Sequence, residues 1–350
     1  MPYLTDMFHE QNRVPTELGG PPAPRPAGAF DPTALTDRLN ARIMGQRNAV
    51  DAVVRAVSVA SVGANEPSRP LANILLAGPT GVGKTELVRQ VAAELRSGPD
   101  NMCRIDMNAL AQEHYAASFS GAPPGYAGSK ESFTLFDRGA VEGDPYTPGI
   151  VLFDEVEKAD TTVLRALLQI LDHGELRLAN GQQTISFRNS YVFLTSNLGS
   201  AELAARLRTP WARLAHRSGW AERRWDGETV VRRAIERFFD PEFFNRLDET
   251  VVMNGFDDRT AREVTGLEID VVTRRLARRS VSVDVGPDVV ALLCTQGFDP
   301  AYGARGLRRT VRTVLTDPVA AAVLEHRPVG TEPLALSTRV VDGRVRVTCA

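Results

Sequence analysis

The segment GPTGVGKT, residues 78–85, constrains the fold of this 350-residue chain more than any other. It follows an apolar run at residues 73–78 and precedes a helical stretch at residues 86–96. A glycine-rich turn between a buried strand and a helix lets backbone N–H groups close around phosphate oxygens, beside the positive end of the helix dipole. The sequence therefore predicts a phosphate-binding loop within an α/β domain.

Three further apolar runs, at residues 103–107, 149–155 and 190–197, have the composition of buried strands. They are rich in β-branched residues and do not alternate with polar ones, as expected for a parallel sheet covered by helices on both faces. Asn180-Gly181 is a strong signal for a two-residue hairpin turn. The predicted fold class is α/β, with a parallel sheet between helices.

The chain divides into three predicted parts. Residues 1–30 are rich in proline and glycine and are expected to form a flexible tail. Residues 31–256 form the large α/β domain, and residues 257–350 a small α+β domain. In the small domain we expect an arginine-rich helix at residues 259–279, a strand at 280–285, two or three helices, and a last hairpin around Asp342-Gly343.

Composition excludes several classes of protein. The 41 basic and 43 acidic residues give a formal net charge of -2, so there is no overall basic footprint and we expect no nucleic-acid partner. No apolar run approaches the roughly 18 residues of a membrane-spanning helix. Asp6 and Glu10 argue against a secretory signal. The three cysteines lack metal-ligand spacing and suit a reducing compartment, so a cytoplasmic location is expected.

The loop residues expected to cradle the phosphates of ATP are Gly78, Pro79, Thr80, Gly81, Val82, Gly83, Lys84 and Thr85. Lys84 is one of only three lysines in an arginine-rich chain. A compact ammonium fits between phosphate oxygens where a planar guanidinium would not, so we expect Lys84 to neutralise the β and γ phosphates. The hydroxyl of Thr85 is expected to hold Mg²⁺.

Two other predicted strands end in polar side chains. Asp154 and Glu155 follow the run IVLF, and Asn197 ends the run VFLTSN. Ligands of open α/β sheets bind at the carboxyl ends of the strands. We therefore expect Asp154 to complete the Mg²⁺ site, Glu155 to activate the attacking water, and Asn197 to reach the γ-phosphate. Taken alone, the acidic pair is typical of a surface strand end, and an asparagine there of a turn.

These elements, in this order, resemble the Clp family of AAA+ ATPases, and more closely the second ATPase module of ClpB-type disaggregases. The resemblance runs from about residue 30 to the end of the chain. It is carried by IMGQRNAV, GPTGVGKTEL, RIDM, GAPPGYAG, LFDEVEKA, LLQILDHGEL, TSNLGS, PEFFNRLDE and GFDPAYGARGLRR. It implies an AAA+ fold and an ATP hydrolase that uses Mg²⁺ and works as a single-ring homo-hexamer on a protein substrate.

The resemblance also implies roles for single residues. Arg246 matches the arginine finger that completes the site of a neighbouring subunit, and Arg305 matches the second sensor arginine. Without the resemblance, Arg246 would pass for an ion-pair partner of Asp248 or Glu249, and Arg305 for one more cation at the start of an arginine-rich helix.

Ile43 and Met44 match the segment that packs on adenine; as bare sequence they are core residues. Tyr126 matches the aromatic residue of a loop that projects into the central pore, and the alternative is a partly buried turn tyrosine. The residues of this substrate-gripping loop are Gly125, Tyr126, Ala127 and Gly128.

The chain departs from the family in two stretches. Protease-coupled relatives carry an aliphatic-Gly-hydrophobic tripeptide, whereas residues 218–220 read Ser-Gly-Trp, so we do not expect docking to a ClpP-type peptidase. Residues 203–225 are rich in arginine and tryptophan. We interpret this insert as a solvated helical face, and binding to a partner or nucleic acid is the alternative.

The resemblance thus implies an ATP-driven hexamer that threads polypeptide through its pore. One alternative is a scaffold whose nucleotide state assembles or disassembles a dedicated complex without threading. A second alternative is a nucleic-acid motor, which only the arginine-rich insert at residues 203–225 supports.

Overall fold

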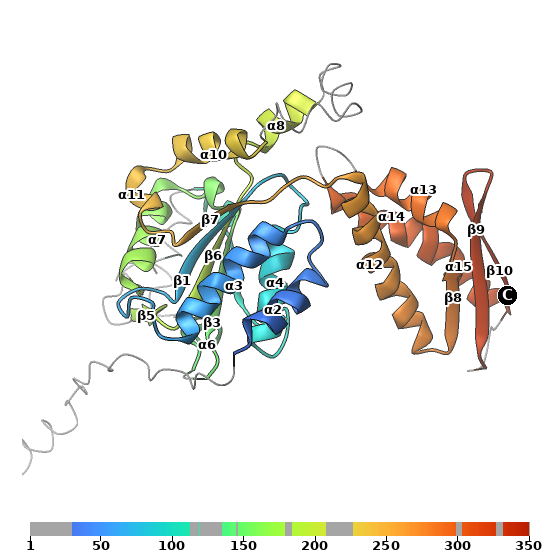
Figure 1. The fold of residues 1–350 in the computed structure, drawn as a ribbon, viewed down its shortest axis with the longest axis horizontal. Helices are drawn as coiled ribbons and strands as arrows, with labels where there is room; N and C mark the ends of the chain where they lie inside the picture. The colour runs from blue at the N-terminus through green and yellow to red at the C-terminus, as the bar shows by residue number, and fades with distance from the viewer. Residues whose placement is uncertain are drawn as a thin grey trace, which may run out of the picture.

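A five-stranded parallel sheet forms the centre of the larger part of the molecule (Figure 1). The computed structural model describes residues 30–112, 119, 135–144, 146–178, 184–207, 227–298, 303–326 and 332–349. The strand order is β2-β3-β6-β1-β7. The strands are β1 (Ala72–Ala77), β2 (Cys103–Asp106), β3 (Gly149–Asp154), β6 (Ser190–Ser196) and β7 (Glu249–Val252). Strand β1 therefore lies between β6 and β7.

The four strands expected from apolar runs are present, each within one residue of its predicted ends. Strand β7 was not predicted. It has four residues and pairs only with β1 among the described strands. It begins at the last residue of the motif FFNRLDE, Glu249, so it lacks a long apolar run of its own. The predicted parallel α/β fold is confirmed.

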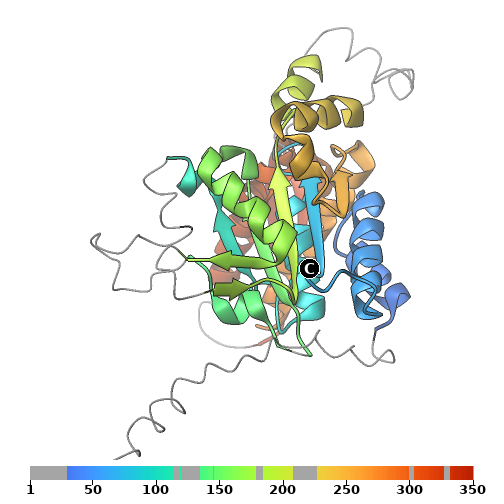
Figure 2. The same ribbon diagram turned by 90° about the vertical axis from the view of Figure 1, so that its left-hand side faces the viewer.

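Helices cover both faces of this sheet, as Figure 2 shows from the side. The helices α2 (Pro32–Asn40), α3 (Arg47–Ser61) and α4 (Lys84–Leu95) share one hydrophobic core with the sheet. The helices α6 (Arg138–Glu142), α7 (Thr161–His173), α10 (Gly227–Phe238) and α11 (Pro241–Phe244) contribute to the other core. The start of α2 is fixed by Asp31, whose carboxylate accepts from the N–H groups of Thr33 and Ala34.

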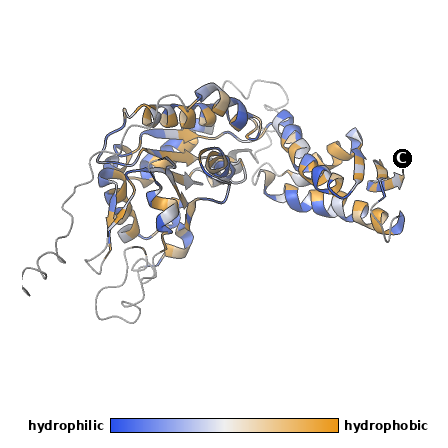
Figure 3. Ribbon diagram, turned by 90° about the horizontal axis from the view of Figure 1, so that it is seen from below, coloured by the Kyte–Doolittle hydropathy of each residue, from blue (hydrophilic) through white to orange (hydrophobic). Residues whose placement is uncertain are grey.

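Successive side chains of a strand point to opposite faces of the sheet, so one strand contributes residues to both cores. Ile74 and Leu76 of β1 belong to the core beside α3, and Leu75 and Ala77 to the core beside α7. Every residue of β1 and β3 is buried, which explains why these segments read as continuous apolar runs. Figure 3, coloured by hydropathy, shows that hydrophobic and hydrophilic residues both occur along the helices.

The short strands β4 (Glu175–Arg177) and β5 (Thr184–Ser186) form an antiparallel pair in which Arg177 lies opposite Thr184. This register is the one that a two-residue turn at Asn180-Gly181 requires, although the turn itself lies outside the described residues. The connecting elements include η1 (Met107–Leu110), η2 (Val156–Lys158) and α8 (Ser200–Leu207).

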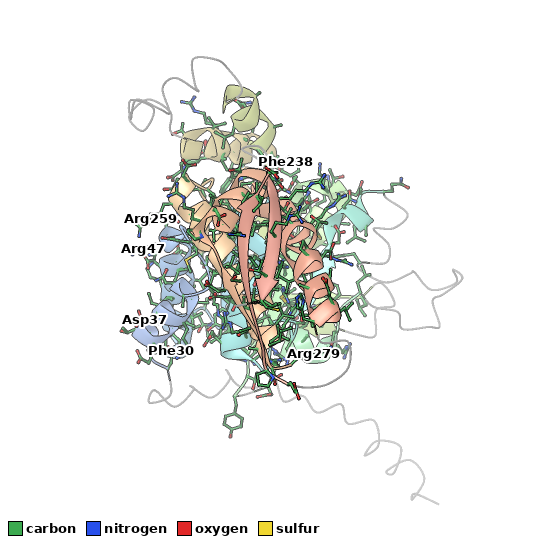
Figure 4. All side chains as sticks on the ribbon, turned by 90° about the vertical axis from the view of Figure 1, so that its right-hand side faces the viewer. Phe30, Asp37, Arg47, Phe238, Arg259 and Arg279 are labelled. Atoms are coloured by element: carbon green, nitrogen blue, oxygen red, sulfur yellow. The ribbon has the colours of Figure 1, made fainter. Side chains whose placement is uncertain are left out.

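A second part of the molecule follows β7 and has its own hydrophobic core. It contains α12 (Asp258–Ala277), β8 (Val281–Val285), α13 (Pro287–Gly297), η3 (Ala304–Gly306), α14 (Leu307–Thr310), the π-helical η4 (Val311–Thr316), α15 (Asp317–His326), β9 (Leu334–Val341) and β10 (Arg344–Cys349). Its sheet has the order β10-β9-β8. Figure 4 views the molecule from this side, with Arg259 and Arg279 marking the two ends of the α12 region.

The expected last hairpin is present. Strands β9 and β10 are antiparallel, and the turn residues Asp342 and Gly343 both have positive φ angles, 50° and 73°. Two positive φ angles define the type I′ turn, whose twist matches that of the strands. The α+β character of the small part is thereby confirmed. The domain limits at residues 30/31 and 256/257 stay a prediction, and the tail lies outside the described residues.

Candidate active site

The phosphate loop connects the end of β1 to the start of α4 through a backbone that requires glycine. Gly78 has φ +141°, and a Cβ atom there would lie 2.5 Å from the main-chain oxygen of Met253. Gly83 has φ 103° and is the N-cap of α4. Both conformations are ones that L side chains rarely adopt. The glycines expected from the sequence are therefore needed to fold the loop tightly against the segment after β7.

The backbone of this loop offers a row of donors. Within the described chain, no N–H group from Thr80 to Glu86 donates a hydrogen bond to another residue, whereas the next one, of Leu87, donates to the Gly83 carbonyl at 2.8 Å. The first turn of a helix leaves such groups without partners inside the helix. Together with the positive end of the helix dipole they suit an anion such as a phosphate group.

Lys84 is buried at the centre of the site, with 7% of its surface exposed. Its Nζ donates to the carbonyls of Gly78 and Pro79, both at 2.7 Å, and to Oδ1 of Asn197 at 2.9 Å. Burial lowers the pKa of Lys84 from 10.5 to about 8. The nearby carboxylates of Glu157, Asp154 and Glu155 act in the opposite direction, while Arg305 lowers the pKa further. Lys84 is therefore mostly charged at neutral pH, although its pKa lies only about one unit above pH 7.

Asp154 ends β3 next to Lys84 and is 8% exposed. Its Oδ1 accepts from the hydroxyls of Thr195, at 2.5 Å, and Thr85, at 3.4 Å. Its Oδ2 forms an ion pair with Arg104 at 2.5 Å. A carboxylate and a hydroxyl this close are the protein ligands that Mg²⁺ takes when phosphate oxygens and water complete its shell. The residues present therefore fit a magnesium-nucleotide complex.

Glu155 adopts a left-handed backbone conformation, with φ 59° and ψ 54°. This conformation is uncommon for residues other than glycine, and such strain is concentrated at functional sites. The Glu155 N–H donates to the Thr195 hydroxyl at 3.0 Å, and its Oε1 accepts from Nδ2 of Asn197 at 3.1 Å. Asn197 thus contacts both Glu155 and Lys84, which belong to different strand ends. The expected convergence of polar residues at this sheet edge is observed.

Glu157 is a third carboxylate of the site. Its Oε1 accepts from the N–H of Asn197 at 3.0 Å, while its Oε2 is buried and has no hydrogen-bond partner in the described chain. It is the carboxylate with the largest effect on the pKa of Lys84. Glu157 therefore helps to hold both the ammonium and the asparagine in place.

Ile43 is buried, with 5% exposed, in the same core as Val82 of the loop, and Met44 beside it is half-buried. The neighbouring Gln46 is fully buried. Its side chain exchanges two hydrogen bonds with the main chain of Asn254, at 2.8 and 3.0 Å. This contact ties the segment before α3 to the chain behind the phosphate loop.

Arg305 lies in η3 at the start of a helical region, and the small part approaches the loop there. The N–H of Ala304 donates to the Gly81 carbonyl at 3.2 Å. Arg308 bridges the two parts, with ion pairs to Glu268 at 2.8 Å and Glu86 at 3.7 Å. Arg305 is exposed, and its charge acts on Lys84. The structure therefore brings Arg305 to the phosphate loop.

Arg246 is not brought to this site. It lies near the amino end of β1, where its carbonyl accepts from Nδ2 of Asn73 at 2.9 Å. The phosphate loop begins five residues further along the strand, at Gly78, or about 17 Å at the usual rise per residue. Its Nε forms an ion pair with Asp172 at 3.0 Å, so the alternative pairing with Asp248 or Glu249 is wrong.

Four residues around the site were not singled out from the sequence: Gln46, Arg104, Glu157 and Thr195. Thr195 had a readable signal, because it is a polar residue within a strand that is buried throughout. Arg104 had none, because it is an exposed residue of β2, in which buried and exposed residues alternate. Gln46 had none, because its partner is 208 residues away. The predicted pore-loop residues Gly125, Tyr126, Ala127 and Gly128 lie outside the described residues.

Comparisons with known proteins agree with this geometry. Residues 69–250 match the family described as "AAA domain (Cdc48 subfamily)", and residues 256–332 match the "C-terminal, D2-small domain, of ClpB protein". The chain belongs to the Clp family of AAA+ ATPases. The resemblance inferred from the sequence motifs is confirmed, and this AAA+ ATPase is an ATP hydrolase by family.

Two relatives are similar to this chain in sequence. An "ATP-dependent protease ATP-binding subunit-like protein" from Rhodococcus erythropolis is 68% identical, over 99% of each chain. The "Chaperone protein ClpB" of Vibrio cholerae is 37% identical, over 89% of this AAA+ ATPase and 34% of ClpB.

A closed-state structure of Hsp104 with ATPγS and FITC casein matches with a TM-score of 0.75 and 26% identity, over 91% of this AAA+ ATPase and 51% of that chain. The AAA+ ATPase is thus related to chaperones of the ClpB and Hsp104 type. No helix in its described residues combines the length and apolar character needed to cross a bilayer.

Proposed function

We propose that this AAA+ ATPase forms a homo-hexameric ring that hydrolyses ATP with Mg²⁺ and threads a protein substrate through its central pore. Ring formation is supported by the relationship to Hsp104, a chaperone solved with casein. The coarser statement, a chaperone-type ATPase, follows from the family.

One observation carries the proposal: the groups of the site are divided between the two ends of β1. Lys84, Asn197 and Glu155 meet at its carboxyl end, whereas Arg246 lies at its amino end. The two ends of β1, at Asn73 and Gly78, are five residues or about 17 Å apart. An arginine held at the amino end is therefore not placed to serve its own site, but it can serve that of an adjacent copy. An arginine supplied in this way accelerates phosphoryl transfer by about 10³- to 10⁵-fold. Hydrolysis would then require assembly.

The roles proposed within one subunit are supported by the contacts. The N–H groups of the loop and Lys84 would bind the phosphates, and Thr85 with Asp154 would hold Mg²⁺, which neutralises charge developing on the phosphate oxygens. Because all three donors of the Lys84 ammonium are engaged by protein oxygens, nucleotide binding must exchange at least one of these hydrogen bonds.

The remaining roles concern water, nucleotide state and adenine. Glu155, oriented by Asn197, would accept a proton from the attacking water. Arg305, through the small domain, would sense the γ-phosphate, and Ile43 with Met44 would pack on adenine. Each of these assignments is part of the proposal.

The alternative is a nucleotide-switched scaffold that assembles or dismantles a dedicated complex without threading. The observation favouring it is that the chain corresponds to only 34% of ClpB. The Rhodococcus relative is named after the ATP-binding subunit of a protease. The polar residue at the start of residues 218–220 still argues against docking to a ClpP-type peptidase here.

The test compares Tyr126→Ala with Tyr126→Phe and with Tyr146→Ala. The last variant removes a tyrosine that is 83% exposed and lies outside the predicted pore loop. ATP hydrolysis and unfolding of a fluorescent protein substrate are measured side by side. Threading predicts that only Tyr126→Ala loses unfolding, with hydrolysis retained. Unfolding by Tyr126→Ala at the wild-type rate would exclude threading by this loop and favour the scaffold.

A further inference from the structure

A buried asparagine stands out at the amino end of β1. Asn73 is the only polar residue of this strand, ANILLA, and is fully buried. Burying an amide costs free energy unless its polar atoms find partners. Its Oδ1 has no hydrogen-bond partner in the described chain. The hydrogen bonds of this buried side chain are therefore made by its amide nitrogen.

The nitrogen of Asn73 joins two segments that are distant in the sequence. Nδ2 donates to the carbonyl of Leu171, at 3.0 Å, and to that of Arg246, at 2.9 Å. Leu171 belongs to the last turn of α7, whose carbonyls have no partner within the helix. The asparagine thus fixes Arg246 against both β1 and the end of α7.

Arg69 makes the same two connections from the loop before β1. Its Nη2 donates to the Arg246 carbonyl at 2.6 Å, and its Nε to the Leu171 carbonyl at 3.3 Å. The Arg246 carbonyl therefore accepts from two side chains, one of them charged. Hydrogen bonds from charged donors are stronger than those between neutral groups. The main chain at Arg246 is thereby tied down on the sheet.

Asp172 acts on the side chain of Arg246. Its Oδ1 lies 3.0 Å from Nε of Arg246, and the two side chains are 30% and 34% exposed. A guanidinium has five N–H donors, so a contact through Nε leaves donors on the terminal nitrogens for phosphate oxygens. The other nearby carboxylates are engaged elsewhere: Asp248 accepts from the N–H of Asn73, and Glu249 from Arg55.

We propose that Arg69, Asn73 and Asp172 form a finger clamp, a set of positioning residues that hold Arg246 in the geometry needed at the active site of a neighbouring copy. This inference rests on the proposed function, in which Arg246 completes that site. Arg69 and Asn73 fix its main chain and Asp172 fixes its guanidinium. A flexible arginine without the clamp would reach the phosphates only in a fraction of its conformations.

The expected effect of losing the clamp is a fall in the turnover number. Misplacing a catalytic group by about 1 Å can cost about 10²-fold in rate. Asp172→Ala is the primary variant because it removes the contact with the guanidinium and because the Asp172 side chain is 30% exposed, whereas Asn73 is fully buried. Asn73→Leu is less suitable because Asn73 is fully buried, and because Arg69 would still donate to the carbonyls of Leu171 and Arg246. We expect Asp172→Ala to lower the turnover number about 10- to 10²-fold, with little change in the KM for ATP.

The decisive experiment uses mixed rings of two kinds of full-length chain. Donor chains carry Glu155→Gln, so that their own sites are inactive, and acceptor chains carry Arg246→Ala, so that they depend on a neighbour's arginine. ATP hydrolysis by the mixture then reports donor arginines acting in acceptor sites. Asp172→Ala is added either to donors or to acceptors. The control is Glu249→Gln, which breaks an ion pair with Arg55 of similar length, 2.9 Å, without touching the clamp.

The clamp predicts that Asp172→Ala in donors lowers the activity of the mixture at least 10-fold, whereas in acceptors it has no effect. If Asp172→Ala lowers ATP hydrolysis equally in donor and acceptor chains, or not at all in donor chains, the clamp is overturned. The proposed role of Arg246 is unaffected by either result. Failure of assembly with Asp172→Ala, but not with Glu249→Gln, would also overturn it, because Asp172 would then be an assembly residue. A donor and acceptor mixture that is inactive without Asp172→Ala refutes the proposed function itself.

Discussion

The depressed pKa of Lys84 leads to a specific dependence of nucleotide binding on pH. The ammonium is buried, and burial is the main reason why its pKa falls from 10.5 to about 8. Only the charged form is suited to phosphate oxygens. Raising the pH from 7 to 9 therefore removes the proton from most nucleotide-free molecules, although a solvent-exposed lysine would remain charged over that interval.

The size of the effect follows from the titration. With a pKa of about 8, roughly nine-tenths of Lys84 is charged at pH 7 and roughly one-tenth at pH 9. If only the charged form binds, the apparent dissociation constant for ATP rises about tenfold between these two pH values. Most of that rise falls above pH 8.

The assay is isothermal titration of the hydrolysis-deficient Glu155→Gln variant with Mg-ATP at half-unit steps of pH. Lys84→Arg serves as the control, since a guanidinium stays charged throughout this range and its weaker binding should not depend on pH. A dissociation constant that stays flat up to pH 9 in the protein with Lys84 would refute the reasoning.

The same shift affects stability, with a definite sign. Below pH 8 the folded and unfolded chains both carry the proton, and the folded chain bears the full cost of burying it. Between pH 8 and 10.5 the folded chain loses the proton while the unfolded chain keeps it. The free energy of unfolding without nucleotide should therefore rise by up to about 3 kcal/mol across this window. The rise should be absent in Lys84→Met, as measured by urea titration at each pH.

Three further predictions concern the loop and its surroundings. Gly78→Ala should lower the free energy of unfolding by about 2–6 kcal/mol, from backbone strain and overlap with a main-chain oxygen. Gly63→Ala, whose Cβ would meet nothing within 4 Å, should cost only about 1–2 kcal/mol in the same urea titration. Glu155→Gln should keep ATP affinity but lower turnover by about 10²–10⁴-fold in a phosphate-release assay. Gln46→Leu should destabilise the protein by about 1–3 kcal/mol, because two hydrogen bonds to the main chain of Asn254 are lost, and equal melting temperatures would contradict this.

The central strands could be predicted because burial on both faces leaves an unmistakable apolar run. The meeting of Lys84, Asp154, Glu155 and Asn197 could also be predicted, since parallel strands end at a common edge. Both inferences need only local sequence and the geometry of a parallel sheet. The tight phosphate loop could be predicted as well, because the sequence has glycine where the backbone needs it. Gly78, for example, has a positive φ angle that other residues rarely adopt.

What could not be predicted depends on contacts between distant segments. Strand β7 is short and acquires its identity only by pairing with β1. Read without the family resemblance, Arg246 would pair with one of its sequence neighbours, Asp248 or Glu249, but the end of α7 supplies Asp172 instead. Gln46 likewise finds Asn254 only after the chain has folded. In each case the local sequence permits several partners, and tertiary packing selects one.

The position of β1 has a consequence for how this chain can evolve. Its residues alternate between two hydrophobic cores, and both of its neighbours are locked to it in register. Inserting or deleting one residue would turn the following side chains toward the wrong core. It would also change the spacing between Asn73 and Gly78 by about 3.3 Å. We infer that substitutions conserving side-chain volume are tolerated in this buried strand, whereas its length of six residues is closed to change.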